Sequence, residues 1–326
     1  MTARLTVSYR LNAHGVDARH DLDSTFEHEG VDITVTARRP DEESFASIKC
    51  SGTVELNLDA ASIERAQGKP AWQIPIETSG RFYFPSGDDA MTVDGLGSAL
   101  ERVDAALRTV GAVIRWRFRL AGRDQVFSDA HVEVALANGV VTELRKSPYS
   151  VTAGDDMAVV REPGWSELAG LMASGLGEPL GHQLLSEAWN LRESNPRSSL
   201  VIAVAAAEVG IKQLIADLVP HARSLVEDLP APPLMKIVSH TLPELPIRAD
   251  VDPGRRCPKH LRSALELAVQ ERNKVVHRGA SPTTWLRPTL VTIREFLYLL
   301  DLYAGHQWAA GLLSEQSRNA TGLRHS

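Results

Sequence analysis

The sequence has few of the features that mark secreted, membrane-spanning or metal-binding proteins. It contains two cysteines, Cys50 and Cys257, which lie far apart in the chain and indicate reduced thiols rather than a disulfide framework. The first residues form no apolar signal segment. The longest apolar run, Leu200 to Ala207, is much shorter than the roughly 20 residues that a membrane span needs. We therefore expect a soluble cytoplasmic protein with no membrane contact.

Several common catalytic motifs are also absent. Gly175-Leu-Gly177 follows no strand-like run, so it does not indicate a dinucleotide site. His131-Val-Glu133 resembles half of a deaminase motif, but no Pro-Cys-x-x-Cys follows. The sequence has no phosphate-binding P-loop, no Gly-x-Ser-x-Gly and no His-Glu-x-x-His. We therefore expect no cofactor and no metal ion.

The charge of the chain is moderate and unevenly distributed. The 326 residues carry 41 acidic and 35 basic side chains, a formal net charge of −6, which argues against a protein that coats nucleic acid. Residues 1–160 hold 24 acidic against 17 basic side chains, and the remainder holds 17 against 18. Between Arg255 and Arg278, seven Lys or Arg stand against two Glu. This local excess permits a phosphate-bearing ligand at one place.

The first 150 residues predict a β-rich domain of sandwich or barrel type that contains one helix. Apolar residues recur at helical spacing from Gly95 to Val110. From Val113 to Leu120 they alternate with Arg115, Arg117 and Arg119, which predicts a strand. Such an arginine face could bind phosphates, but more often it is the solvated face of a sheet. The runs that predict strands are Thr25–Thr36, Ile48–Leu58, Trp72–Pro85, Ala112–Leu120 and His131–Leu136.

The remaining residues predict a linker followed by a four-helix bundle, which makes the whole chain α+β. Gly and Pro interrupt residues 151–177, which we interpret as the linker. The bundle covers residues 178–313, includes an irregular Pro-rich insertion over 220–258, and precedes a flexible tail over 314–326. The expected helices are Glu178–Glu193, Pro196–Leu218 after an Asn195 N-cap, Pro258 to His277 or Arg278, and Pro288–Gly305.

The third predicted helix contains Arg272 and Asn273, followed after three residues by His277. The spacing alone has no specificity, because Arg255/His260 and Arg318/His325 also fall within a gap of four to six residues. The context separates Arg272/His277 from the other two pairs, since only Arg272/His277 lies wholly inside a predicted helix.

In this context the C-terminal half resembles the HEPN superfamily, of the Apea-like ribonuclease and toxin type. The signature of that family is an Arg, four to six residues and a His, often with a polar residue after the Arg. Glu208 interrupts the apolar run of the second helix where such domains often place an acidic or polar side chain. The resemblance covers about Glu178 to Gly305 and leaves the β-rich half unexplained.

The resemblance implies a metal-independent endoribonuclease that binds RNA and acts as a homodimer through the helical bundle. Two protomers would form one site, where a 2′-hydroxyl attacks the phosphate and leaves a 2′,3′-cyclic phosphate. Proteins of this type commonly serve toxin–antitoxin or antiviral defence systems. The β domain would then bind an antitoxin or a trigger protein.

The residue types suit that chemistry. His277 lies in the last turn, where the helix dipole favours imidazolium, and it suits general acid–base work. Arg272 carries a permanent forked charge for a phosphorane-like transition state. Asn273 lies on the face of His277, four residues away, and could orient the phosphate. We list Glu208, Lys274 and Arg278 as supporting residues, and Arg255, Arg256, Lys259 and Arg262 as RNA-binding residues.

The alternative is a non-catalytic dimerisation or adaptor protein whose β domain binds a ligand or a protein. His277 would then be a helix C-cap, Arg272 would form an ordinary surface pairing, and Glu208 would pair with Lys212 on its own helix. The two interpretations differ in what they expect of the structure. The nuclease expects Arg272 and His277 to point into an open basic groove that a second copy can approach, whereas the adaptor expects His277 to be buried in its own bundle and bonded to a carbonyl.

Overall fold

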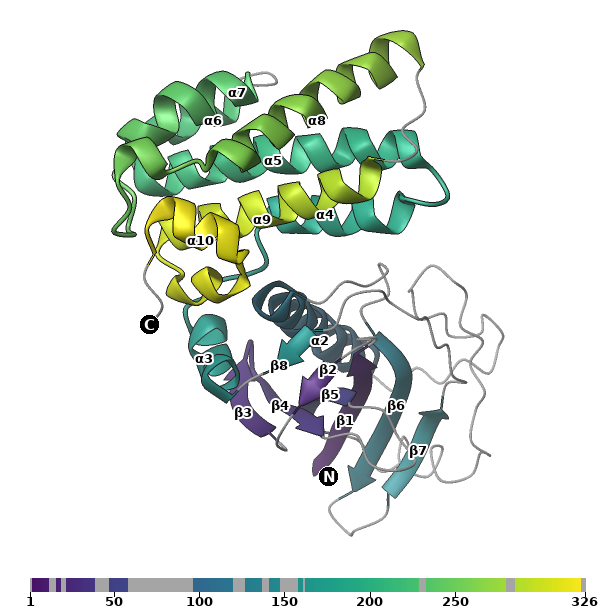
Figure 1. Cartoon of the computed structure of the whole chain (residues 1–326). Helices are drawn as coiled ribbons and strands as arrows, with labels where there is room; N and C mark the ends of the chain where they lie inside the picture. The colour runs from purple at the N-terminus through teal and green to yellow at the C-terminus, as the bar shows by residue number, and fades with distance from the viewer. Residues whose placement is uncertain are drawn as a thin grey trace. The chain divides into compact units, whose positions relative to one another are not determined.

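A computed structural model divides the chain into two compact units, Met1–Gly177 and Glu178–Ser326, which we describe separately (Figure 1). The structure describes residues 2–11, 16–18, 22–38, 47–57, 96–119, 127–136, 141–146, 158–160, 162–228, 233–279 and 285–323. The predicted strand at Trp72–Pro85 lies outside the described residues. The α+β class is confirmed, since a sheet and its helix precede a helical region.

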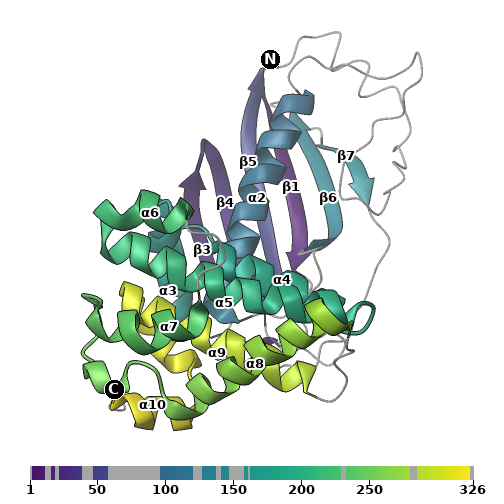
Figure 2. The same cartoon turned by 90° about the horizontal axis from the view of Figure 1, so that it is seen from above.

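The first unit is built on one antiparallel sheet with the strand order β3-β4-β5-β1-β6-β7 (Figure 2). Its described strands form this open sheet and a separate parallel pair, so the expected sandwich or barrel is wrong for this part of the chain. The sheet strands are β1 Thr2–Leu11, β3 Leu22–His28, β4 Val31–Arg38, β5 Ser47–Asn57, β6 Phe127–Leu136 and β7 Val141–Lys146. The parallel pair is β2 Val16–Ala18 with β8 Ala158–Val160.

Helix α2, Leu96–Phe118, covers one face of the sheet and explains why no second sheet is needed (Figure 2). The expected alternation on β4 is confirmed, because Val31, Ile33 and Val35 are fully buried in the same core as α2. Gly52 on β5 permits the close approach, since a Cβ at that position would lie 2.7 Å from Cγ1 of Val103 on α2. The core therefore lies between a helix and a sheet face.

The strand predicted over Val113–Leu120 is wrong, because the residues up to Phe118 continue helix α2. Ile114 and Phe118 extend the helical spacing and are buried. The expected solvated arginine face is also wrong at Arg117, which is 9% exposed and donates to Glu167 Oε2 at 2.9 Å. A short run of alternating apolar residues fits both the strand period and the helix period. Here the helix forms because its apolar side chains pack on the sheet.

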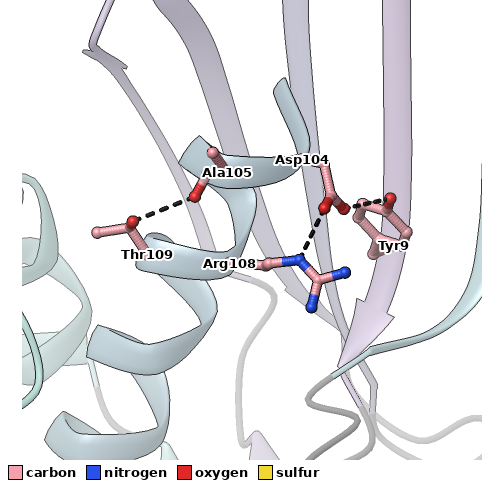
Figure 3. A network of polar contacts seen from close by, with 5 residues as sticks. All are labelled: Tyr9, Asp104, Ala105, Arg108 and Thr109. Carbon is pink, nitrogen blue, oxygen red and sulfur yellow. Dashed lines mark hydrogen bonds and ion pairs between the residues drawn. The ribbon is translucent and has the colours of Figure 1, made fainter. Parts of the chain in front are cut away.

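A polar cluster joins the sheet to α2 (Figure 3). The hydroxyl of Tyr9 on β1 donates to Asp104 Oδ1 at 2.7 Å, and Arg108 Nε donates to Asp104 Oδ2 at the same distance. Tyr9 is largely buried, so its hydroxyl needs such a partner. On the opposite sheet face, hydroxyls pair across β1 and β5, with Ser8 and Ser51 2.9 Å apart.

The stretch predicted as a linker contains regular structure in its second half. Glu162–Ala173 forms helix α3, so the linker expectation is wrong there. Trp165 and Leu168 of this helix belong to the core of the first unit. Phe118 at the end of α2 lies with its ring centroid 5.8 Å from that of Trp165. The apolar residues of α3 therefore pack on the core that the sheet and α2 form, although Gly and Pro residues surround them in the sequence.

The second unit contains the long helices α4 Leu180–Leu191, α5 Pro196–Leu218, α8 Lys259–Arg278 and α9 Leu286–Ala304 (Figure 1). These helices match the predicted spans within a few residues. The predicted N-cap is confirmed, because the Asn195 side chain accepts from the Ser198 amide at 3.2 Å. Gly279 ends α8 in the left-handed conformation, with φ 65°.

Helix α5 is the core helix of this unit. It is the one helix in the described part of the chain that is long and apolar enough to cross a membrane by length and composition, and most of it is buried inside the unit. A Cβ at Gly210 would overlap Leu297 of α9, and one at Gly181 of α4 would lie 3.1 Å from the Ala206 carbonyl. Small residues thus let α4 and α9 approach α5 closely.

The Pro-rich stretch after α5 is a series of short turns. They are η1 Pro220–Ala222, α6 Arg223–Asp228, α7 Leu234–Lys236, η2 Ile237–Thr241, η3 Leu242–Glu244 and η4 Pro253–Arg255. Arg256 holds several of them, because its Nη1 donates to the carbonyls of Leu242, Pro243 and Leu245 at 3.2, 2.6 and 2.6 Å. The Tyr303 hydroxyl on α9 donates to the Arg256 carbonyl at 2.6 Å.

The expected flexible tail is wrong for residues 314–323. A short 3-10 helix, η5 Gln307–Leu312, leads into helix α10, Glu315–Thr321. Ser314 caps α10 by accepting from the Ser317 amide, and Ser317 and Thr321 are buried. A polar composition suggested fraying, but hydroxyl side chains can be buried when each has a hydrogen-bond partner.

We expect Gly52→Ala to destabilise the first unit by about 1–3 kcal/mol, because its Cβ would press on Val103 and, at 3.2 Å, on Val31. The control is Gly170→Ala on α3, where a Cβ meets nothing within 4 Å. Urea unfolding followed by circular dichroism measures both variants. An unchanged midpoint for Gly52→Ala would contradict the packing described for β5 and α2.

We expect Arg256→Lys to lower the free energy of unfolding by about 2 kcal/mol, because one ammonium cannot replace the forked donor to several carbonyls. Arg255→Lys is the matched control, since Arg255 is exposed and its replacement should stay within about 0.5 kcal/mol of wild type. Thermal unfolding of both variants checks this. Equal effects would mean that Arg256 does not organise the turns.

Candidate functional site

The arginine of the candidate motif is held by an acid on the neighbouring helix. Arg272 on α8 places Nη2 2.9 Å from Oε1 of Glu208 on α5, and its side chain is 24% exposed. Its Nε is buried and has no hydrogen-bond partner among the described residues. The structure therefore brings together the two residues that the sequence placed on separate helices.

Burial has the largest effect on the pKa of Glu208, whose side chain is 12% exposed. Desolvation raises the pKa of its carboxyl, and the charges of Arg272 and Lys212 offset part of that shift. Glu208 forms its ion pair with Arg272 on α8, and Lys212 on its own helix acts on it through its charge. A charge on α5 needs a partner at this depth, and Arg272 supplies it.

Asn273 and His277 lie on a different side of α8 from Arg272. Both are exposed, one turn apart, in the last turns of the helix. Successive residues are rotated by about 100°, so Arg272 turns toward α5 while Asn273 turns toward solvent. His277 has the accessibility that the nuclease interpretation expects, whereas Arg272 is 24% exposed and is paired with Glu208.

The basic residues of α8 and its approach divide into two groups at opposite ends of the helix. Lys274, which pairs with Glu271, and the exposed Arg278 lie at the C-terminal end beside His277. Lys259 and Arg262 are exposed at the N-terminal end, about 15 Å or more from Arg272 along the helix. Arg255 is exposed before that end, whereas Arg256 is held by backbone carbonyls and is not presented to a ligand.

The two other pairs with motif spacing have structural surroundings. His260 Nε2 lies 3.0 Å from the Ser317 hydroxyl, which ties α8 to α10. Ser317 and Ser314 also bond Glu295, so the pKa of Glu295 is lowered although burial alone would raise it. Arg318 donates to the Leu313 carbonyl at 3.2 Å, and His325 lies outside the described residues.

The structure also contains a buried histidine–aspartate pair that the sequence did not predict. His182 on α4 places Nε2 2.8 Å from Oδ2 of Asp301 on α9, and both side chains are less than 10% exposed. The ring centroid of Tyr298 lies 4.8 Å from that of His182. Nearby, burial lowers the pKa of His306. No short motif marks these residues, because they meet only through helix packing.

The described residues offer no thiol nucleophile and no metal centre. Burial raises the pKa of both cysteines, that of Cys257 to about 12, so neither thiol is ionised near neutral pH. Within the same residues, no group of three His, Cys, Asp or Glu side chains could hold a metal ion. The polar side chains at the end of α8 remain as the candidate site.

The geometry of this site is all that bears on its identity. Comparisons of the chain with protein-family models, with curated proteins and with solved structures found no match.

Proposed function

We propose that this protein is a metal-independent endoribonuclease of the HEPN type, with its site at the C-terminal end of α8. The observation that carries the proposal is the Arg272–Glu208 ion pair in the same C-terminal part of α8 that exposes Asn273 and His277 on another side of the helix. It links the arginine of the motif to the acid on the preceding long helix, as the resemblance implies.

The proposed reaction needs only proton transfer and charge stabilisation. His277 accepts the proton of an RNA 2′-hydroxyl while that oxygen bonds to the adjacent phosphorus. The bond from phosphorus to the 5′ oxygen breaks, and a protonated imidazole supplies a proton to the leaving oxygen. The products are a 2′,3′-cyclic phosphate and a 5′-hydroxyl, so atoms and charges balance.

Two copies of the chain suit this reaction better than one. One His277 takes a proton on one side of the phosphorus while a second, from the partner copy, gives a proton on the other side. Arg272 stabilises the charge that develops on the phosphate oxygens, and Asn273 orients the phosphate. We therefore propose a homodimer through the helical unit.

The first unit is proposed to bind the protein that controls the enzyme. Its acidic excess favours a basic partner surface, and an antitoxin or a trigger protein fits a role in toxin–antitoxin or antiviral defence. The adaptor alternative expects His277 to be buried on a carbonyl, and the exposure of His277 favours the nuclease.

We expect the wild type to cleave single-stranded RNA in EDTA, and His277→Ala and Arg272→Lys each to lower the rate by about 100-fold or more. Mass analysis of the products should show 2′,3′-cyclic phosphate ends. The matched control is His240→Ala, an exposed histidine outside the site, which should keep full activity. Cleavage that survives unchanged in both site variants would reject the assignment.

A second test separates the stability of the ion pair from its role in cleavage. Arg272→Met leaves Glu208 buried and unpaired, so we expect it to cost about 3 kcal/mol of unfolding free energy, whereas Glu208→Gln/Arg272→Met should recover most of this. We expect the double variant to remain inactive. A double variant that is stable and still cleaves RNA would show that Arg272 only supports the fold.

A further inference from the structure

The packing of the second unit brings four helix ends together at one side of α5. On α4, Gly181 packs on Ala206, whereas the Ala188 carbonyl, seven residues later, accepts from the Ser199 hydroxyl at 2.6 Å. Residue numbers rise on α4 as they fall on α5, so these two helices are antiparallel. The C-terminal end of α4 therefore lies beside the N-terminal end of α5.

Helix α9 begins at the same end. His182 near the start of α4 pairs with Asp301 near the end of α9, whereas Trp189 near the end of α4 lies under the guanidinium of Arg294, 5.3 Å away. The two helices are therefore antiparallel, and the start of α9 lies near the end of α4.

The chain length places the end of α8 there as well. Six residues separate Arg278 at the end of α8 from Trp285 before α9 and can span at most about 25 Å, whereas α9 itself is nearly 30 Å long. Helix α8 therefore ends at the same end of the unit as the start of α9 and the α4–α5 turn, and Figure 1 shows it rising away from α5 toward its tip (Figures 1 and 2).

These four ends carry basic side chains from different parts of the sequence. Arg197 in the first turn of α5, Arg287 in the first turn of α9 and Arg278 at the end of α8 are exposed. Arg192 follows α4, is 31% exposed, and is fixed by its bond to the Trp189 carbonyl at 3.1 Å. We call Arg192, Arg197, Arg278 and Arg287 the basic end.

Acidic side chains compensate this charge only in part. Arg192 bonds Glu193, and Lys274 bonds Glu271, whereas Arg197 and Arg278 form no ion pair within the described part of the chain. Neutral residues form the connection from 280 to 284. At the opposite end of the unit, by contrast, Arg256 is held by carbonyls, and the acids Asp217 and Asp301 lie near His306.

We propose that the basic end binds the sugar–phosphate backbone of single-stranded RNA and leads the strand to Asn273 and His277. This inference rests on the proposed function and extends the substrate contact from one helix to four. The guanidinium groups bind phosphates without reading bases, so they contribute affinity rather than sequence preference. This path replaces the expectation that Arg255, Lys259 and Arg262 bind RNA, because these residues lie at the other end of α8, about 15 Å or more from Arg272 along the helix.

The test compares two triple variants with the same loss of charge, each in a His277→Ala chain that cannot cleave the probe. Arg192→Gln/Arg197→Gln/Arg287→Gln removes charge from the basic end, and Arg255→Gln/Lys259→Gln/Arg262→Gln removes it from the other end of α8. Fluorescence anisotropy with a short labelled single-stranded RNA gives Kd over a salt series. Circular dichroism checks that both variants are folded.

We expect the first variant to raise Kd at least about tenfold. The slope of log K against log salt should fall by about 2, because each of the three lost phosphate contacts contributes about 0.7. The second variant should stay close to the parent chain. Weaker binding in the second variant alone, or a loss in the first without a change of slope, would overturn the inference. Binding of no RNA by the parent chain would instead reject the proposed function.

Discussion

The ion pair between Arg272 and Glu208 is the constraint on which the second unit depends. Glu208 lies on the apolar core helix α5 and is largely buried, so its charge needs a partner within hydrogen-bond distance. In the register that α8 adopts on α5, Arg272 lies at that depth. The same register leaves the last turns of α8 with Asn273 and His277 in solvent. A packing requirement thereby decides where the chemistry can take place.

The polar side chains at the two ends of the unit serve different purposes. At one end, Arg256 bonds turn carbonyls, His260 bonds Ser317, and His182 bonds Asp301, so these groups are used by the fold. At the other end, Arg197, Arg278 and Arg287 are exposed in the first or last turns of three helices. A charge that the fold uses cannot also bind a ligand without loss of stability, so a ligand is expected at the end where the charges are exposed.

The sequence was informative where one period dominated over several turns. The helices α5, α8 and α9 and the buried face of β4 followed from apolar spacing, from Asn195 and from Gly279. Short alternation misled over Val113–Leu120, because its apolar residues also satisfy the helical period and the sheet offers α2 a face to cover. For the site, the Arg272–Glu208 contact was suggested only through the family resemblance. Pairs such as His182 and Asp301 depend on helix packing, which spacing along the chain does not encode.

The net charge of the chain is a poor guide to what the protein binds, because electrostatic interactions are screened over about 10 Å at moderate salt. A bound phosphate therefore experiences mainly the charges within that radius and not the total charge of the chain. Affinity must then come from several guanidinium groups that contact one strand together, and this makes the geometry of the four helix ends more important than the total number of charges.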